Sequence, residues 1–431
     1  MIILLIMLVL FGLLFLGVPV AFAFGLFTLF LMTKLKFSWD LLGSVPFYSL
    51  DSFPLMAIPF FIFAGDLMRE GKISGHIIAF INSIIGRIRG SLGAVTVLAC
   101  MVFGTISGSS VATVSAIGSI MIPEMTKTGY NKRYATALVA AAGFLGTLIP
   151  PSIPGVVYAI SSGVSIAAIF VATVVPGIIL ASFYILVNYL IFGRKQPKQA
   201  GPFSVKALFQ NVASSGKDAS WALFMPVIIL GGIYGGIFTP TEAAAVSVIY
   251  GLFVGWFIYH GLNRKNILGI FRDSALTSCV LLIVLALAGS LLGRVFTVAK
   301  APDYIAELMM QMTKSPVVFL LLFNIFVLIL GCFLETNTMV IILTPIFVPI
   351  AQKYGIHPIH FGAILLLNVE IGLITPPFAG NLFVACRVSN LQLDEIVRPL
   401  LPFLFVCFPT LAITTYIPWV SMWLPRLLGV G

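Results

Sequence analysis

Two apolar segments of this chain are each interrupted by a pair of adjacent prolines, Pro150-Pro151 and Pro376-Pro377. The residues around them correspond at a constant separation, so that Gly146 matches Gly372. Proline lacks the backbone N–H and clashes with the preceding helical turn, so each segment is predicted to stop, unwind and restart as helix. Unpaired backbone within a membrane is tolerated where it lines a cavity, and a matched pair of interruptions indicates a transporter binding site.

Composition places the whole chain in the membrane. Of its 431 residues, 60% are hydrophobic and only 9% are charged, which excludes a soluble globular protein and predicts an all-α polytopic membrane protein. The net charge of +10 does not indicate nucleic-acid binding, because Lys and Arg stand singly between apolar segments, where they determine topology. The five cysteines have no metal-ligand spacing and are interpreted as small buried hydrophobic residues.

Two further segments consist of two short apolar arms around a polar centre. The centres are Ser107-Gly108-Ser109-Ser110 in the first half of the chain and Glu335-Thr336-Asn337-Thr338 in the second. Each arm has about 15 residues, or roughly 22 Å as a helix, which is short of the roughly 30 Å hydrocarbon core. Each segment is therefore predicted to be a re-entrant helical hairpin whose polar tip lies in mid-membrane.

The two halves of the chain present a hairpin and then a broken helix in the same order. Counting membrane crossings predicts that the two repeats are inverted, and the distribution of Lys and Arg supports that orientation. The predicted division is 1–89 as scaffold and arm of the first repeat, 90–160 as first hairpin and broken helix, 161–192 as a scaffold span, 193–220 as a cytoplasmic linker, 221–314 as scaffold and arm of the second repeat, 315–385 as second hairpin and broken helix, and 386–431 as a C-terminal link and span. Within the second repeat, Thr239 and Glu242 are predicted to form a helix capping box.

Four motifs, in this order, make the chain recognisable: FGTISGSSVATVSAIGSIMIPEM, GTLIPPSIPGV, FTPTEAAAVSVIYG and GLITPPFAGN. Together they resemble the large membrane subunit of tripartite ATP-independent periplasmic (TRAP) transporters, over essentially the whole chain. The resemblance implies sodium-driven uptake of a carboxylate of the sialic acid or C4-dicarboxylate type across the bacterial inner membrane. It also implies an elevator mechanism, in which the hairpins and broken helices slide as a unit against the remaining helices.

The same resemblance implies partners but no cofactor. A small membrane subunit of about four helices, the Q subunit, completes the transporter, and a periplasmic substrate-binding protein, the P protein, delivers the small organic acid. Membrane lipids surround the complex, no nucleic acid is expected to bind, and Na⁺ is the coupling ion.

Sodium prefers oxygen ligands, and the hairpin tips and the helix breaks supply them as hydroxyls, amides and freed carbonyls. The predicted sodium-binding residues are Ser107, Ser109, Ser110, Thr113, Gly146, Thr147 and Pro150 at the first site, and Thr336, Asn337, Thr338, Gly372, Thr375 and Gly380 at the second. Helix N-termini at the tips favour an anion between them. The predicted substrate-binding residues are Ser110, Ser152, Thr338 and Asn381, of which Ser110 and Thr338 are also expected to cap the second arms.

The acidic residues within apolar segments leave more than one interpretation open. An intramembrane carboxylate is a functional candidate by default. Glu335 is expected to be either a cation ligand or proton carrier, or a simple hydrogen-bonding group. Asp66 and Glu370 are expected to lie near a membrane interface or to pair with Arg or Lys.

Three other functions compete with this prediction. Gly104–Gly108 loosely resembles a serine nucleophile loop, but all four histidines fall at segment ends or in polar links, which argues against an intramembrane hydrolase and against any enzyme. A channel would not need a binding protein. A symporter for Na⁺ and a carboxylate that works without a binding protein is the closest alternative. Clusters of Ser and Gly also serve close helix packing, and only their pairing with two helix breaks favours binding.

Overall fold

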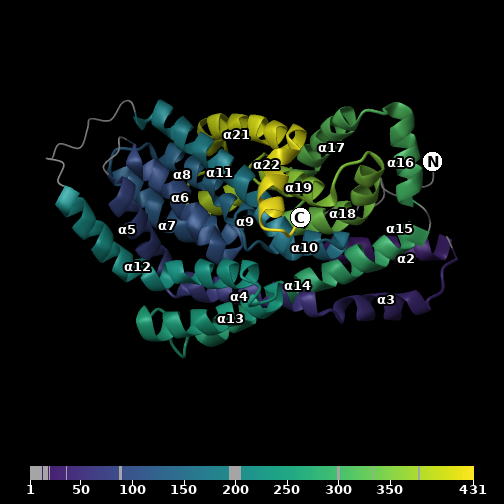
Figure 1. Ribbon diagram of the computed structural model, residues 1–431, viewed down its shortest axis with the longest axis horizontal. Coiled ribbons are helices and arrows are strands. Elements are labelled where there is room, and N and C mark those ends of the chain that lie inside the picture. The colour runs from purple at the N-terminus through teal and green to yellow at the C-terminus, as the bar shows by residue number, and fades with distance from the viewer. Residues whose placement is uncertain are drawn as a thin grey trace.

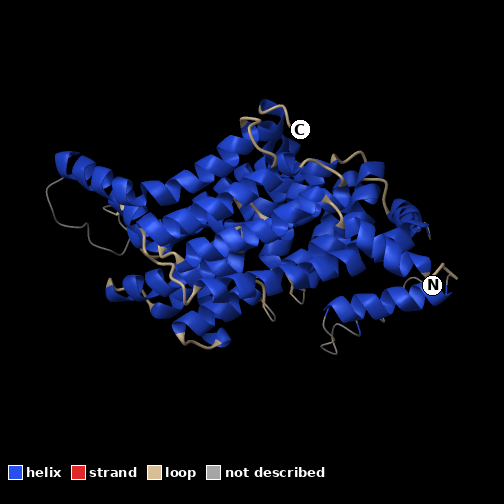
Figure 2. Cartoon of the chain, turned by 90° about the horizontal axis from the view of Figure 1, so that it is seen from below, coloured by secondary structure: helices blue, strands red, loops and turns tan. Residues whose placement is uncertain are grey.

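The computed structural model describes residues 20–34, 36–86, 90–193, 205–298, 301–332, 334–376 and 379–431, together with Gly12 and Val18. Every regular element in these ranges is a helix, as Figure 2 shows. The predicted all-α class is therefore confirmed. Pro377 of the second interruption lies outside the described residues.

Helices long and apolar enough to cross a membrane recur along the described ranges. Five single helices meet that standard, and the number rises to eight if each of three bent helix pairs is counted as one span. One of them, α11 (Ile166–Ile191), has 26 residues. This supports a multi-pass membrane protein.

Figure 1 shows how the helices of the two halves are arranged. The first half contains α2 (Val20–Lys34), α3 (Asp40–Leu50), η1 (Phe53–Met56), α4 (Ala57–Glu70), α5 (Ile73–Ile85), α6 (Ser91–Ser107), α7 (Ser110–Lys127), α8 (Lys132–Gly143), α9 (Leu145–Leu148), α10 (Ile153–Ser162) and α11. The second half contains α12 (Val205–Tyr234), α13 (Pro240–Phe253), η3 (Val254–Ile258), α14 (Ile267–Val284), η4 (Leu285–Leu292), α15 (Gly293–Val298), α16 (Ala301–Met312), α17 (Pro316–Gly331), α18 (Thr336–Lys353), α19 (Pro358–Gly372), α20 (Gly380–Ser389), α21 (Leu393–Tyr416) and α22 (Pro418–Leu427).

The predicted hairpins and helix breaks are present as helix pairs. The first hairpin is α6 and α7, which turn at Gly108, and the second is α17 and α18. The first broken helix bends by 42° between α9 and α10, and the second ends at Gly372 and resumes at Gly380. In Figure 1 the two hairpins lie on either side of α9 and α10. Helix α9 contacts the first hairpin, and α10 contacts α18 of the second. The inversion of the repeats and the division into domains stay predictions.

The polar segment 193–220, predicted to be a linker, is partly helical. Its residues from Val205 onward already belong to α12, which continues without interruption to Tyr234 and packs along α5. The predicted capping box does form, because the Thr239 backbone N–H donates to Glu242 Oε2 at 2.8 Å and the Glu242 N–H donates to Thr239 Oγ1 at 3.3 Å. This geometry satisfies two otherwise orphaned N–H groups at the start of α13.

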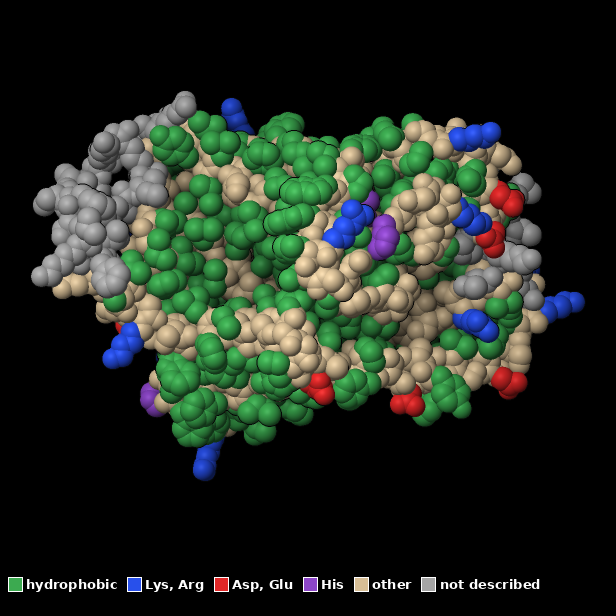
Figure 3. All heavy atoms as spheres, viewed as in Figure 1, with side chains coloured by type: hydrophobic (Ala, Val, Ile, Leu, Met, Phe, Trp, Pro, Cys, Tyr) green, Lys and Arg blue, Asp and Glu red, His purple; other side chains and the backbone are tan. Residues whose placement is uncertain are grey.

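One hydrophobic core runs through both halves. It includes the large fully buried rings of Phe103, Phe144, Tyr184 and Phe361, from α6 through α19. Hydrophobic side chains also cover most of the face seen in Figure 3, with charged side chains mainly toward its margins. A broad apolar exterior between charged margins is the surface expected of a protein surrounded by lipid.

Candidate functional site

A cavity of about 260 Å³ lies where both hairpin tips meet both helix breaks. Its lining comes from the first tip (Gly108–Val111), the first break (Thr147, Ile153 and Pro154), the second tip (Leu334–Asn337) and the second broken helix (Glu370, Leu373 and Gly380). Segments separated by more than half of the chain thus converge on one space. Residues predicted for each of the two sites are among those that line this cavity.

The two tips are built alike around a helix N-terminus. Ser109 precedes α7 and its Oγ accepts a hydrogen bond from the Ala112 N–H at 3.4 Å. Glu335 precedes α18 and its Oε2 accepts from the Thr338 N–H at 3.1 Å. The capping residues are therefore Ser109 and Glu335, and the expectation that Ser110 and Thr338 cap these helices was wrong, because a cap accepts from the N–H three residues onward.

A pair of glycines brings each hairpin against its broken helix. A Cβ placed on Gly104 of α6 would lie 2.2 Å from the Gly146 Cα, and a Cβ on Gly331 of α17 would lie 2.8 Å from the Gly372 Cα. Both distances are too short for any side chain, so the backbones touch directly. The same glycine contact in both halves holds each tip close to its break.

The predicted residues divide into those that line the cavity and those packed around it. Those on the lining are Ser109, Ser110, Thr147, Thr336, Asn337 and Gly380. Those not on the lining are Ser107, Thr113, Gly146, Pro150, Ser152, Thr338, Gly372, Thr375 and Asn381. The structure therefore brings the two groups into one region without assigning a ligand to any of them.

Several of the residues off the lining have a structural partner. Thr113 Oγ1 donates to the Ser109 carbonyl at 2.8 Å and lies 3.2 Å from Ser107 Oγ, so these side chains brace the first tip. Ser152 Oγ accepts from the Gly155 N–H at 3.2 Å and caps α10. Asn381 is fully buried, and neither of its amide atoms has a hydrogen-bond partner among the described residues.

Glu370 is the acidic residue that sequence reasoning misplaced. It is only 1% exposed, lines the cavity, and no basic residue is paired with it in the described ranges. The expectation that it pairs with Arg or Lys is therefore wrong for the described residues. Its position two residues before Gly372, which matches Gly146 at the first break, was the available signal.

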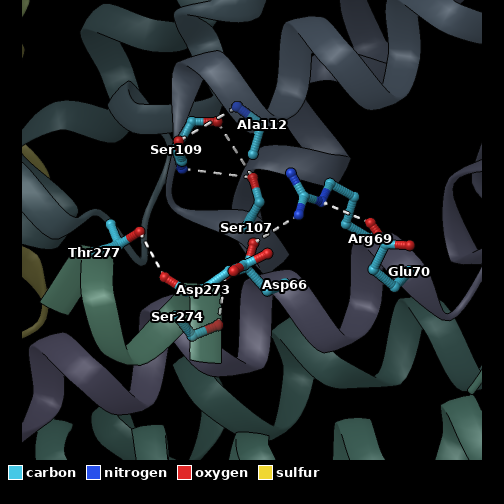
Figure 4. A network of polar contacts seen from close by, with 9 residues as sticks. All are labelled: Asp66, Arg69, Glu70, Ser107, Ser109, Ala112, Asp273, Ser274 and Thr277. Carbon is cyan, nitrogen blue, oxygen red and sulfur yellow. Dashed lines mark hydrogen bonds and ion pairs between the residues drawn. The ribbon is translucent and has the colours of Figure 1, made fainter. Parts of the chain in front are cut away.

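Asp66 behaves as expected, through a network beside the first tip (Figure 4). Its carboxylate lies 3.2 Å from Arg69 and accepts from Ser274 Oγ at 2.6 Å, which links α4 to α14. The preceding residue, Gly65, packs so closely on the hairpin that a Cβ there would lie 2.8 Å from the Ser107 carbonyl oxygen. At Gly65, α4 thus runs directly against the tip of the first hairpin.

This arrangement suits the binding of an anion and a cation side by side. Two helices begin at the cavity, and their N-termini carry partial positive charge that favours an anion. Hydroxyl, amide and carboxylate oxygens line the same space and suit a hard cation such as Na⁺. Three of those oxygen-bearing groups, Thr336, Asn337 and Glu370, each have an oxygen without a hydrogen-bond partner among the described residues.

Comparison with known proteins identifies the family. The model of the tripartite ATP-independent periplasmic transporter, DctM component, matches residues 7–420. The C4-dicarboxylate TRAP transporter large permease protein DctM of Pseudomonas aeruginosa is 42% identical over 93% of this chain and 93% of its own length. The isethionate TRAP transporter permease protein DctMQ of Oleidesulfovibrio alaskensis is 39% identical over 94% of this chain, which spans only 64% of that relative.

A solved structure supports the fold alone. The YdaH transporter of Alcanivorax borkumensis superposes with a TM-score of 0.63, covering 90% of this chain and 88% of its own, at 16% identity. Family and relatives alike describe a transporter permease and not an enzyme. The chain belongs to the family of DctM components, the large permease subunits of tripartite ATP-independent periplasmic transporters.

Proposed function

We propose that this chain carries out secondary uptake of a small carboxylate, driven by Na⁺ and supplied by a periplasmic binding protein. The observation that carries the proposal is the single cavity formed by both hairpin tips and both helix breaks. Broken helices that place dipole ends and free carbonyls at one point are the means by which transporters bind anion and cation together.

The carboxylate class rests on chemistry and on relatives. The N-termini of α7 and α18 both open at the cavity and favour a negatively charged group. The P. aeruginosa relative is named for C4-dicarboxylates, whereas the other relative is named for isethionate, a sulfonate, so only the first of these two names supports a carboxylate. A C4-dicarboxylate is therefore the first substrate to test, and sialic acid, which the motifs also imply, is the second.

An elevator movement fits the packing of α4 against the first hairpin. Glycine at position 65 lets the helix backbone lie on the Ser107 carbonyl without an interlocking side chain. At this one contact no side chain has to interdigitate, which opposes sliding less than an interlocked contact would. We propose that the hairpins and broken helices move together past α4 and the helices packed on it.

A separate small membrane subunit and a periplasmic protein are proposed as partners, in the bacterial inner membrane. The DctMQ relative is longer than this chain, as a large subunit joined to a small one would be. Exposed apolar side chains on α13, η3 and α14, including Ile249, Phe257 and Leu276, are available for lipid or for such a subunit.

Uptake into proteoliposomes tests the proposal. Vesicles would contain this chain and the small subunit, with labelled C4-dicarboxylate or sialic acid outside, and binding protein and an inward Na⁺ gradient would each be added or omitted. Uptake that requires both additions is the expected result. Uptake with Na⁺ but without binding protein would instead assign the chain to the symporters that work alone, and uptake without Na⁺ would contradict sodium coupling.

A further inference from the structure

Glu370 places a buried carboxyl group on the lining of the cavity between the two halves of the chain. Both of its carboxylate oxygens are buried and have no hydrogen-bond partner among the described residues. We infer that Glu370 is the anionic ligand of a cation site shared by the two halves of the chain, with the hydroxyls of Ser110, Thr147 and Thr336 around it. The inference rests on the proposed sodium coupling and names a ligand that the sequence did not predict.

The ionised form of a buried carboxyl group is costly unless a partner compensates its charge. Removing an ionised carboxylate from water is tolerated when a cation or a set of donors compensates it. The six ion pairs of the described ranges do not include Glu370. Glu335, the other acid on the lining, differs in this respect, because it accepts hydrogen bonds from the Asn337 amide at 2.8 Å and from the Thr338 N–H at 3.1 Å.

The surroundings of Glu370 supply further oxygens from three different elements. The hydroxyls of Ser110 in α7, Thr147 in α9 and Thr336 in α18 are the side chains that face its carboxylate. The Thr336 hydroxyl is itself buried and without a partner in the described structure. A carboxylate surrounded by hydroxyl oxygens suits a hard cation such as Na⁺. No cluster of three or more His, Cys, Asp or Glu occurs among the described residues, so a transition-metal site is not indicated.

Glu370 also interrupts the correspondence between the repeats. At the separation that matches Gly146 with Gly372, Ser110 matches Thr336, so the two hairpins contribute equivalent hydroxyls. The residue that matches Glu370 is Phe144, which is fully buried in the core. The second repeat therefore has a carboxylate at a position where the first repeat has none, and it lies between the two equivalent tips. A cation bound to it would link the two tips.

The position of this cation bears on the order of binding. Glu335 and Glu370 both line the cavity, and their negative charges repel an anionic substrate. A cation held by Glu370 lowers that repulsion before the substrate arrives. Sodium is therefore expected to bind first and to raise the affinity for the carboxylate.

Thermal unfolding of the purified transporter, with and without Na⁺, tests this inference independently of transport. A ligand that binds the folded state raises the melting temperature, by an amount that grows with the logarithm of one plus the ratio of the free ligand concentration to Kd. The melting temperature would be measured against NaCl, with choline chloride holding the ionic strength constant, in wild type, Glu370→Gln, Thr336→Val and the control Glu307→Gln. Glu307 is an exposed carboxylate on α16, away from the cavity lining.

Glu370→Gln is expected to raise the Na⁺ concentration that produces a given rise in melting temperature by about a hundredfold or more, because the bound cation loses its anionic partner. Thr336→Val is expected to raise it by a smaller factor, and Glu307→Gln to leave it unchanged. If Glu370→Gln does not fold, Thr336→Val decides the question. Wild-type values in the variant that folds would overturn the inference. No effect of Na⁺ on wild type would instead contradict the proposed sodium coupling.

Discussion

The contact between Gly104 and Gly146 provides a test of whether the tip geometry controls sodium binding. In Gly104→Ala the new Cβ would lie 2.2 Å from the Gly146 Cα, whereas ordinary van der Waals contact begins at 3.4 Å. The first arm must therefore move away from the broken helix by about 1 Å, because the Gly146 atoms that the new Cβ meets are backbone atoms and cannot rotate aside. That movement separates the tip oxygens from those of the break.

The size of the effect follows from the cost of overpacking. Inserting a methyl group into a close-packed contact costs about 1–3 kcal/mol. If the bound state carries that cost, the affinity for Na⁺ falls by roughly 5- to 150-fold. Initial rates of uptake, measured against Na⁺ concentration at equal amounts of inserted protein, report the change.

A matched control separates this effect from a general response to alanine. A Cβ on Gly269 of α14 has nothing within 4 Å, so Gly269→Ala adds a methyl group in open space. It is expected to leave the Na⁺ dependence unchanged and, through helix propensity, to stabilise α14 by about 0.5–1 kcal/mol. Equal Na⁺ dependence in Gly104→Ala and Gly269→Ala would refute the argument that the glycine contact sets the site.

Two further predictions address the cavity and the cap. Ser110→Ala and Asn337→Ala each remove a polar group from the lining and are expected to abolish Na⁺-driven uptake while the protein still inserts and assembles, as blots and size-exclusion profiles would show; normal transport in both variants would contradict the model. Thr239→Ala removes the cap of α13 and is expected to cost about 1 kcal/mol of stability without changing substrate affinity. A changed substrate affinity would place Thr239 in the binding machinery instead.

The sequence was most informative where local chemistry decides the structure. Adjacent prolines stop a helix wherever they occur, and a threonine three residues before a glutamate caps a helix by itself, so both breaks and the capping box at Thr239 could be predicted. The capping residues at the tips were missed by one position at Ser109 and by three at Glu335. The first error is small because neighbouring hydroxyls compete for the same role.

The environment of Glu370 could not be predicted from its own segment. The hydroxyls that face it belong to Ser110, Thr147 and Thr336, and two of these lie more than half of the chain away. Only the folded packing of two hairpins against α19 brings them together, and no local pattern encodes it. The helical part of segment 193–220 was missed for a related reason. Its polar composition suggested a linker, whereas packing along α5 keeps these residues in α12.

Simultaneous measurement of sodium and substrate flux tests the central claim most directly. Proteoliposomes with this chain, the small subunit and the binding protein would receive radioactive Na⁺ and labelled C4-dicarboxylate or sialic acid together. Substrate uptake accompanied by Na⁺ uptake at a fixed ratio, lost together in Ser110→Ala, is the predicted result. Substrate uptake without any Na⁺ movement would contradict a shared site for the two.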